Sequence, residues 1–530
     1  MNKKITKCLC LAMGLTMSLS VFGGCNGGGN SGDAGVNGDD AKTIYVQMYE
    51  GGYGAEVYKA IAKDFEAAYA DEGYSIVIAE SPSLVYSSIE SRLKAGPKIN
   101  QTDLFLGGDV NIPYILSQGS SYVSGYELAL EDLTDLYNSK VYGEETLFKD
   151  KLNADCVSQN QYNGKYYSTN WAGGATGFAY NVDFFTQNGW TVPNTTKELV
   201  ALVQKIRAAN YTPFVWCGTT ASYWEYALMP WWRQLSTDEE VERFWNCEDE
   251  DGNLTADNFK SQARLQAYQI LESLIYDTKN SHSKSMTLTH IEAQMHLYDK
   301  NNKIAMMPTG DWIENEMYIN GYARETSNVG FMKIPVASEV LYQYDSQGNQ
   351  TLRFPTVDSD EKLSKVIADI DAGKNSSEGV SAEDFAALKK IRSYNYTLSF
   401  THNAMIPVYA DAKVGAKKFL SYLASDEALQ KYYDMTGAFL PYDISNVVLK
   451  NNATKYQQDL YSVMSNISFL SSTNYQSKFF YRTELSFSYG KAEAYIGTTA
   501  KEEQMTGKEY YDYVYYYYSS NFDTYVALAR

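Results

Sequence analysis

Apolar residues recur along this chain in two different periods, and the alternation of these periods predicts strands and helices in turn. From residue 43 onward, the stretches TIYVQMY, YSIVIA and DLFLGG are rich in β-branched and aromatic residues, which predicts three short strands. The stretches AEVYKAIAKDFEAAY and YSSIESRLKAG lie between them with apolar residues at helical spacing, and each is followed by a glycine stop. This alternation predicts a parallel sheet with helices on its faces.

A second alternation begins near residue 196 and predicts a second α/β lobe. LVALVQKIRAA is typical of a helix, YTPFVW of a strand, and residues 262–276 of a long amphipathic helix. Between the two lobes, residues 163–185 mix glycine with aromatic residues without a clear period, which favours a crossing between lobes. Residues 340–395 are polar and contain DSQGNQ, a hairpin-turn pattern, so we interpret them as an insertion. The tyrosine run at 510–518 predicts a helix or strand that faces both protein and water.

The first 40 residues predict export and attachment to a membrane surface. Residues 1–24 combine a basic start with a short apolar stretch, which is typical of a signal peptide. FGGC resembles the lipobox of bacterial lipoproteins, which implies that Cys25 is lipidated and becomes the mature N-terminus; a plain secretory peptide is the alternative. The Gly/Asn/Asp-rich residues that follow, within 25–42, predict a flexible linker that lets the folded part stand away from the membrane.

Charge and cysteine content narrow the class of protein. The 530 residues contain 64 acidic and 45 basic side chains, a formal net charge of −19, which argues against a nucleic-acid partner. Beyond Cys25 only Cys156, Cys217 and Cys247 remain in the folded part. An odd number argues against a disulfide scaffold, although a bridge between Cys217 and Cys247 stays open.

Most enzyme signatures are absent. No G-x-S-x-G, H-E-x-x-H or Walker motif occurs, and His290 and His296 stand six residues apart, on different faces of a helix. CEDEDGN at 247–253 has the wrong register for a calcium loop and predicts a turn. We therefore expect no metal, no cofactor and no enzymatic activity. Hydrolysis by a surface glycan-active enzyme stays open as an alternative, because acidic residues are too numerous for a catalytic pair to be singled out.

Aromatic and acidic residues at the ends of predicted strands favour a carbohydrate ligand. A pyranose has apolar faces that suit flat aromatic rings, and its hydroxyl edge suits carboxylates. The carboxyl ends of parallel strands, where open α/β sheets bind ligands, carry several such residues. The candidate ligand-binding residues are Tyr49, Glu50, Tyr53, Glu80, Asp109, Trp171, Tyr223, Trp224, Asp311 and Trp312. These loops contain no arginine, which favours a neutral ligand, and several aromatic platforms favour an oligosaccharide; a receptor for a charged small solute is the alternative.

Trp312 stands at a strand-to-helix corner within IAMMPTGDWIENEM. Asp311 is expected to cap a helix that begins at Trp312, with Glu314 completing a capping box. The indole is expected to be held by the buried strand on one side and left open for a ligand on the other. All eight tryptophans lie between residues 171 and 312, and most of them, including Trp190, Trp216 and Trp245, are expected to be core residues.

Taken together, several motifs resemble the extracellular solute-binding proteins of family 1, the maltose-binding-like sugar receptors of ABC transporters. The motifs are IYVQMYEGGYG, VIAESPSLVYSSIESRL, TDLFLGGDV, NGKYYSTNWAGGATGFAYNVDFF, KIAMMPTGDW, VGFMKIPV and AKKFLSYLASDEALQKYYDMTGAFLP. The resemblance implies a two-lobed, type II periplasmic-binding-protein-like α/β fold that closes on its ligand by a hinge. Lobe 1 would comprise 43–168 and 336–434, and lobe 2 would comprise 169–335 and 435–530.

The same resemblance implies a function and a location. The protein would capture a carbohydrate outside the cell and deliver it to the permease subunits of an ABC importer. It would be a monomer, lipid-anchored on the extracellular face of a Gram-positive-type cell membrane. By this resemblance, Glu80 in AESP matches an acid of the family that contacts sugar.

Overall fold

The computed structural model describes residues 41–82, 84–324, 328–344, 349–471, 477 and 485–529. The expected signal peptide, Cys25 and the linker as far as residue 40 lie outside the described residues. Within the described part of the chain, none of the helices has both the length and the apolar character needed to cross a membrane.

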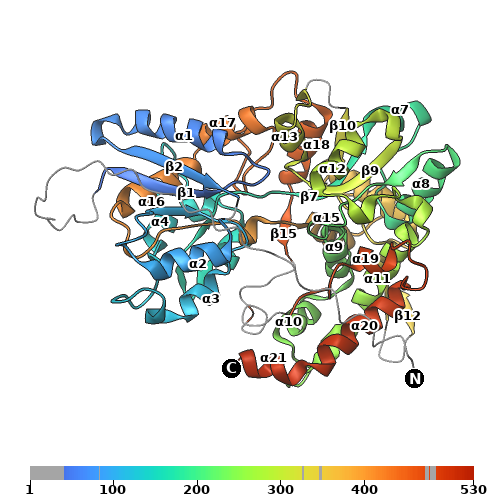
Figure 1. Cartoon of the computed structure of the whole chain (residues 1–530). Helices are drawn as coiled ribbons and strands as arrows, with labels where there is room; N and C mark the ends of the chain where they lie inside the picture. Colours follow the sequence, from blue (N-terminus) through green and yellow to red (C-terminus); the bar gives the residue numbers. More distant parts are fainter. Residues whose placement is uncertain are drawn as a thin grey trace, which may run out of the picture. The chain divides into compact units, whose positions relative to one another are not determined.

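The first sheet contains the three strands expected near the N-terminus. Its order is β2-β1-β3-β14-β6, and β1 runs parallel to both β2 and β3, which confirms the predicted parallel arrangement (Figure 1). The bounds are β1 Thr43–Tyr49, β2 Ser75–Ser81, β3 Leu104–Leu106, β14 Asn403–Met405 and β6 Thr169–Asn170. β14 pairs antiparallel with β3 and β6, so two later segments complete a sheet that the N-terminal segments begin.

Alternation along β1 places one face of this sheet in the core. Ile44, Val46 and Met48 are buried and belong to the same apolar cluster as Ile61 and Phe65 of α1. Between residues 55 and 166 the helices are α1 Ala55–Ala68, α2 Tyr86–Ala95, α3 Ile112–Ser117, α4 Thr134–Tyr137, α5 Phe148–Lys151 and α6 Ala154–Gln159, and a hairpin is formed by β4 Gln161–Tyr162 and β5 Lys165–Tyr166. Two later helices are α16 Lys413–Leu423 and α17 Asp426–Thr436.

A second sheet has the order β10-β7-β9-β8. β7 is antiparallel to β9 and β10, whereas β8 is parallel to β9. Its strands are β7 Thr176–Asn181, β8 Thr212–Phe214, β9 Ile304–Gly310 and β10 Val329–Met332. Every residue of β7 and β9 is buried, so this sheet is covered on both faces.

The remaining helices include the ones predicted from periodicity. α8 spans Thr196–Ala208, α11 spans Gln262–Ile275, and the tyrosine run forms part of helix α20, Gly507–Ser520. Outside the insertion, the structure also has α7 Val182–Asn188, α9 Glu225–Leu235, α10 Asp238–Asn246, α12 His290–Tyr298, α13 Ile313–Ile319, α18 Lys455–Met464, α19 Ala492–Ile496 and α21 Phe522–Ala529.

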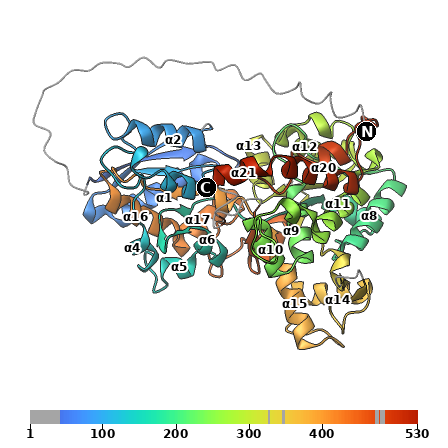
Figure 2. The same cartoon turned by 90° about the horizontal axis from the view of Figure 1, so that it is seen from below.

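The polar insertion is structured and packs on elements that we assigned to lobe 2. It contains the antiparallel pair β11 Tyr342–Tyr344 and β12 Gln350–Leu352, and helices α14 Asp360–Asp371 and α15 Ala382–Ser393, which pack side by side (Figure 2). Thr195 donates a hydrogen bond to Asp360 over 2.9 Å, and Arg353 donates to the Gln234 carbonyl over 2.8 Å. The assignment of 336–434 to lobe 1 stays a prediction, and the insertion itself contacts residues that were expected in lobe 2.

Two crossings between the sheets lie side by side and are joined by hydrogen bonds. One runs from β6 to β7 through residues 171–175, and the other from β13, Tyr394–Tyr396, to β14; β13 itself pairs with β15, Ser468–Leu470. The Asn170 amide donates to the Ser399 carbonyl over 2.6 Å, and the Ser399 hydroxyl donates to the Gly173 carbonyl over 2.7 Å. Gly173 has φ +86°, which only glycine adopts without strain. The expected crossing at 163–185 is thus confirmed for residues 171–175.

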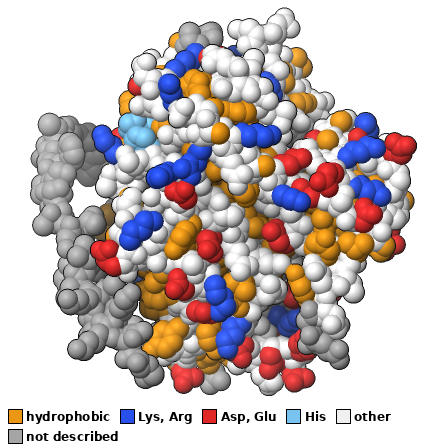
Figure 3. Space-filling model, turned by 90° about the vertical axis from the view of Figure 1, so that its right-hand side faces the viewer, with side chains coloured by type: hydrophobic (Ala, Val, Ile, Leu, Met, Phe, Trp, Pro, Cys, Tyr) orange, Lys and Arg blue, Asp and Glu red, His pale blue; other side chains and the backbone are white. Residues whose placement is uncertain are grey.

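The predicted surface and cysteine features can also be compared with the structure. On the face shown in Figure 3, basic and acidic side chains are interspersed. Cys156, Cys217 and Cys247 are buried free thiols, so the bridge that was left open is not formed. CEDEDGN forms a turn, as predicted, in which the Asp249 carboxylate accepts from the backbone N–H of Asn253. Among the described residues no cluster of His, Cys, Asp or Glu could hold a metal ion.

Candidate functional site

A cavity of about 680 Å³ lies where the loop after β1 meets α12, α13 and the crossing at residues 398–402. Both sheets contribute to it through residues at the ends of their strands. Its lining comprises Tyr49, Glu50, Gly51, Gly52, Tyr53, Gly54, Pro82, Asp109, Thr220, Ala221, Tyr223, Tyr226, His290, Ile291, Trp312, Glu316, Ile319, Asn320, Leu398 and His402.

The first sheet contributes the residues that follow its parallel strands. Tyr49 ends β1, and its ring centroid lies 5.9 Å from that of His402. Asp109 follows β3 with φ +51°, a left-handed conformation that is uncommon for a residue with a side chain. Burial raises the pKa of the Tyr49 hydroxyl, and the carboxylates of Asp109 and Glu316 raise it further. The negative charges of Asp109, which follows β3, and of Glu316, on α13, therefore both act on the Tyr49 hydroxyl.

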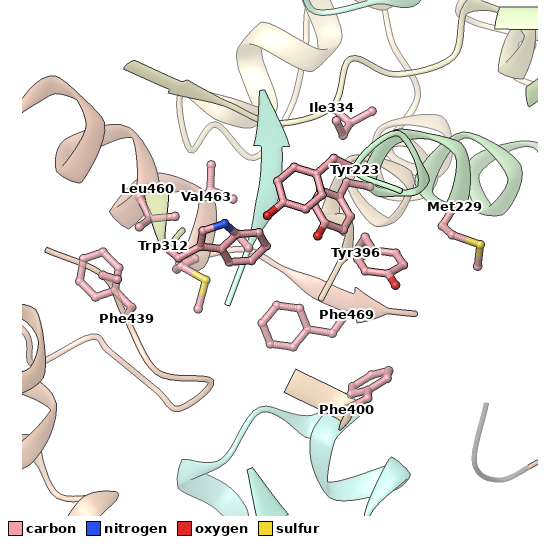
Figure 4. Packing of buried hydrophobic residues seen from close by; sticks show 14 of the residues in the cluster. Tyr223, Met229, Trp312, Ile334, Tyr396, Phe400, Phe439, Leu460, Val463 and Phe469 are labelled. Carbon is pink, nitrogen blue, oxygen red and sulfur yellow. The ribbon is translucent and has the colours of Figure 1, made fainter. Parts of the chain in front are cut away.

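Aromatic rings packed edge to face form one wall. The Trp312 ring centroid lies 6.4 Å from that of Tyr53, 6.0 Å from Tyr223 and 5.9 Å from Tyr226. Figure 4 shows the Trp312 and Tyr223 side chains pointing toward one another. Trp312 is 4% exposed, which is less than the half-open ring that the sequence suggested. The wall is therefore rigid, because each ring is fixed by its neighbours.

The corner at Trp312 is built differently from the predicted capping box. α13 begins at Ile313, Trp312 occupies the N-cap position, and no side chain caps the helix. A Cβ on Gly310 would lie 2.1 Å from the Trp312 ring, so the glycine leaves room for the indole. Glu314 instead accepts hydrogen bonds from the Thr454 hydroxyl (2.7 Å) and the Gln457 amide (2.6 Å). The capping-box prediction is wrong because no side chain caps α13 and the Glu314 carboxylate binds Thr454 and Gln457.

Asp311 is a buried acid behind the wall. It is 1% exposed, and neither carboxyl oxygen has a hydrogen-bond partner among the described residues. Burial raises the pKa of Asp311 well above its usual value. A Cβ on Gly174 would approach its Oδ2 to 2.5 Å, so the acid packs directly on the crossing. Burial therefore favours the neutral form of the Asp311 carboxyl, since an unpaired charge there would be unfavourable.

Glu316 lies one helical turn beyond Trp312 and lines the cavity itself. It is 7% exposed; Gln294 donates a hydrogen bond to Oε2 over 2.6 Å, and the His290 Nε2 lies 3.7 Å from Oε1. Burial raises the pKa of the Glu316 carboxyl to about 7, against the lowering effect of the Gln294 hydrogen bond. Burial also lowers the pKa of His290, so this imidazole is neutral near pH 7. Glu316 is thus an acid that titrates near neutrality.

Asn315 fastens α13 to the loop after β1. Its side-chain amide donates to the carbonyl oxygens of Gly52 (2.9 Å) and Tyr53 (3.1 Å). Arg324 donates to the Asn315 Oδ1 over 2.6 Å and to the Met435 carbonyl over 2.6 Å. These hydrogen bonds fix the orientation of the amide and hold two parts of the cavity lining together.

Replacing Asn315 by aspartate is expected to lower the free energy of unfolding by about 1–3 kcal/mol at pH 8. The substitution places a carboxylate oxygen against two carbonyl oxygens in place of the donating amide. Urea denaturation measures the effect. Asn375→Asp, the same change at an exposed position, is the control and should leave the midpoint nearly unchanged. Equal midpoints for the two variants would show that the fastening contributes no stability.

A C-terminal segment holds the loop that precedes α9. The Lys491 ammonium donates to the carbonyl oxygens of Gly218 (2.7 Å) and Thr220, and the Ser222 hydroxyl donates to Glu493 over 2.8 Å. Glu493 is fully buried, and this burial raises the pKa of its carboxyl to about 7. Residues 491–493 therefore position Thr220 and Tyr223 at the cavity from the far end of the chain.

Comparison with known proteins gives this cavity a context. The family model described as bacterial extracellular solute-binding protein matches residues 51–430. The chain belongs to this family. Its members are binding proteins that act outside the cell.

Individual relatives of this solute-binding protein are distant. The diacetylchitobiose binding protein NgcE of Streptomyces coelicolor is 21% identical over 278 residues, which are 52% of this chain and 54% of that protein; the chain thus spans about half the length of this curated relative. Maltose-bound MalE3 of T. maritima superposes with a TM-score of 0.56 and 16% identity, covering 90% of this chain and 99% of that one. Apo RafE of Streptococcus pneumoniae superposes with a TM-score of 0.55 and 14% identity, covering 91% of this chain and 98% of that one. These likenesses show the two-lobed α/β fold.

Six of the ten residues predicted as ligand contacts in this solute-binding protein line the cavity, and their contact with a ligand stays a prediction. They are Tyr49, Glu50, Tyr53, Asp109, Tyr223 and Trp312. The structure places the other four outside the described lining. Glu80 pairs with Lys59 over 3.2 Å, and Asp311 lies behind Trp312. Trp171 and Trp224 are fully buried: the Trp171 indole donates to the Gly107 carbonyl, and Trp224 packs on Phe178 and Phe214.

Sequence reasoning missed several lining residues that periodicity could have indicated. Glu316 follows Trp312 by four residues and Tyr226 follows Tyr223 by three, spacings that return a helix to the same face. His290 was considered only as a metal ligand, and His402 was not considered as a site residue. In the structure both line the cavity, and burial lowers the pKa of each.

Proposed function

We propose that this solute-binding protein captures a carbohydrate, with an oligosaccharide favoured, and delivers it to the permease subunits of an ABC importer. The observation that carries the proposal is the lining of the cavity. Aromatic rings of Tyr49, Trp312 and Tyr223 stand beside the carboxylates of Glu50 and Asp109. Flat rings suit the apolar faces of a sugar, and carboxylates accept hydrogen bonds from its hydroxyls.

The size of the cavity and the family support the same proposal. A volume of about 680 Å³ falls within the range of small-molecule sites and leaves room for more than one sugar ring. NgcE is named for binding diacetylchitobiose, and MalE3 holds maltose. Among the described lining residues there is no lysine or arginine to pair with an anion, which disfavours an acidic solute. We propose no covalent chemistry.

The proposal includes the location of the protein. Export by the signal peptide and acylation of Cys25 would hold a monomer on the extracellular face of a Gram-positive-type membrane. The linker that follows Cys25 would give the folded part the reach to meet its permease.

Titration calorimetry and thermal-shift measurements against a panel of glycans test the ligand class. Maltose, cellobiose, xylobiose, raffinose and N,N′-diacetylchitobiose, with their longer homologues, form the panel. At least one neutral saccharide is expected to bind and to raise the melting temperature, because a ligand of the folded state stabilises it by mass action. Binding of an acidic solute without binding of any saccharide would contradict the proposal, as would hydrolysis of the saccharide during incubation.

A pair of tyrosines on one strand provides the matched variants. Tyr49→Ala is expected to weaken saccharide binding by about 1 kcal/mol, roughly fivefold, because the ring at the end of β1 lines the cavity. Tyr45→Ala, four residues earlier on β1 and exposed, should leave affinity unchanged. Calorimetry on the tightest glycan measures both. Equal effects of the two substitutions would place the ligand elsewhere.

A further inference from the structure

The acids of the cavity have no cationic counterpart in its lining. Glu50, Asp109 and Glu316 line it, and among the described lining residues there is no lysine or arginine. Glu50 and Asp109 are exposed, so water can solvate their charges. Glu316 is different because it is more than nine-tenths buried. The local potential is therefore negative, and it is least compensated by solvent at Glu316.

The partners of Glu316 leave its negative charge unpaired. Gln294 supplies a neutral amide to Oε2, and His290 stands 3.7 Å from Oε1. Burial lowers the pKa of His290, so it is uncharged near pH 7. In the described part of the chain no lysine or arginine forms an ion pair with Glu316. A buried carboxylate without a cation is unfavourable. A ligand that carries a positive charge can supply the missing partner.

A second feature independently points to a polar ligand at the same place. Tyr53 lines the cavity and is 5% exposed, yet its hydroxyl has no hydrogen-bond partner among the described residues. A buried hydroxyl is normally paired. Its ring packs on that of Trp312, which lies one helical turn before Glu316. An aromatic platform, an unpaired hydroxyl and an unpaired carboxylate thus meet in one cavity.

We propose that the cavity takes a saccharide that carries a protonated amino group, with the ammonium paired to the Glu316 carboxylate. This inference rests on the proposed carbohydrate function and replaces the neutral ligand expected from the sequence. An organic cation is favoured over a metal ion, since no cluster of ligating side chains in the described residues could hold a metal. The aromatic wall favours a sugar ring over a flexible polyamine, because a flat platform suits the pyranose face.

Three disaccharides that differ only at carbon 2 test the inference. Cellobiose carries hydroxyls there, N,N′-diacetylchitobiose carries neutral acetamido groups, and chitobiose carries amines. Calorimetry at pH 7 and low ionic strength is expected to give at least about tenfold tighter binding for chitobiose than for either neutral form, equivalent to about 1.4 kcal/mol. The preference should shrink at high salt, because screening weakens charge pairing.

Two substitutions assign the preference to Glu316. Glu316→Gln is expected to reduce the affinity ratio of chitobiose to cellobiose to near one. Glu378→Gln, which removes the same charge from an exposed side chain of the insertion, should keep the ratio of the wild-type protein. An unchanged ratio in Glu316→Gln would overturn the assignment to Glu316.

The outcomes separate this inference from the proposed function. If the neutral disaccharides bind as tightly as chitobiose or more tightly, the inference fails and the carbohydrate function stands. If no member of this set and no member of the wider glycan panel binds, both fail together.

Discussion

Replacing Trp312 by alanine is expected to lower the free energy of unfolding by about 3–5 kcal/mol and, in the protein that remains folded, to weaken ligand binding by about 2–4 kcal/mol. The first effect arises because the indole is 4% exposed and packed against three tyrosine rings, so its removal leaves a void. The second arises because the same ring is a wall of the cavity. Both are among the largest effects that a single substitution should have in this molecule.

Separating the two effects requires a tryptophan of similar burial away from the cavity. Trp245 of α10 is 7% exposed, packs on Trp232 and Phe244, and is not part of the described lining. Trp245→Ala should lower stability by a similar amount and leave affinity for the best glycan of the panel near that of the wild type. Urea denaturation and calorimetry, both well below the melting temperatures of the variants, give the two quantities. Equal affinity losses in the two variants would mean that Trp312 acts only through packing.

The dual role of Trp312 explains what could be predicted from sequence at this corner. Its position at the end of a buried strand follows from the apolar run and the glycine before it. The burial of its ring does not, because Tyr53, Tyr223 and Tyr226 come from segments far away in the chain. The predicted Asp311 cap failed for a related reason. The acid sits at the right spacing, but it packs on Gly174 and does not cap the helix.

Local periodicity predicted the elements of the fold better than their pairing. The β1-α1-β2-α2-β3 order follows from strand and helix patterns within about 65 residues of sequence. β14 is only three residues long and joins the first sheet from residue 403, a pairing that no local pattern indicates. The contacts of the insertion follow no local pattern either, because partners such as Thr195 lie far from it in sequence.

The rule for strand ends located part of the site. Tyr49 and Asp109 line the cavity, as expected for residues at the carboxyl ends of parallel strands. Trp171 lies on the predicted crossing, but its indole turns inward to bond the Gly107 carbonyl. A sequence shows where a residue stands along the chain, and the direction of a bulky side chain depends on the packing around it. Glu316 was missed although helical spacing links it to Trp312.

Glu316→Gln is expected to stabilise the unliganded protein at pH 8 by up to about 3 kcal/mol while weakening the binding of a cationic saccharide. Burial raises the pKa of Glu316 from 4.5 to about 7, so the folded state binds a proton more tightly than the unfolded state does. Stability from this group is then fully present below about pH 4.5 and is lost as the pH rises through 7. Each pH unit between the two pKa values corresponds to about 1.4 kcal/mol. Glutamine has no charge to bury, so the free energy of unfolding of the variant does not fall in this pH range because of this residue.

Glu339 separates the stability effect from the ligand effect. It lies outside the described lining, and burial raises the pKa of its carboxyl as well. Glu339→Gln should therefore flatten the dependence of stability on pH in the same direction and leave the preference for an amino sugar intact. Urea midpoints at pH 5, 6, 7 and 8 measure the first effect, and calorimetry with chitobiose and cellobiose measures the second. A pH profile of Glu316→Gln that parallels the wild-type profile would mean that the pKa of Glu316 is not raised in the free protein, and that its charge is already compensated there. A flatter profile in Glu316→Gln would show that the buried charge of Glu316 destabilises the unliganded protein, and a cationic ligand would offset this destabilisation.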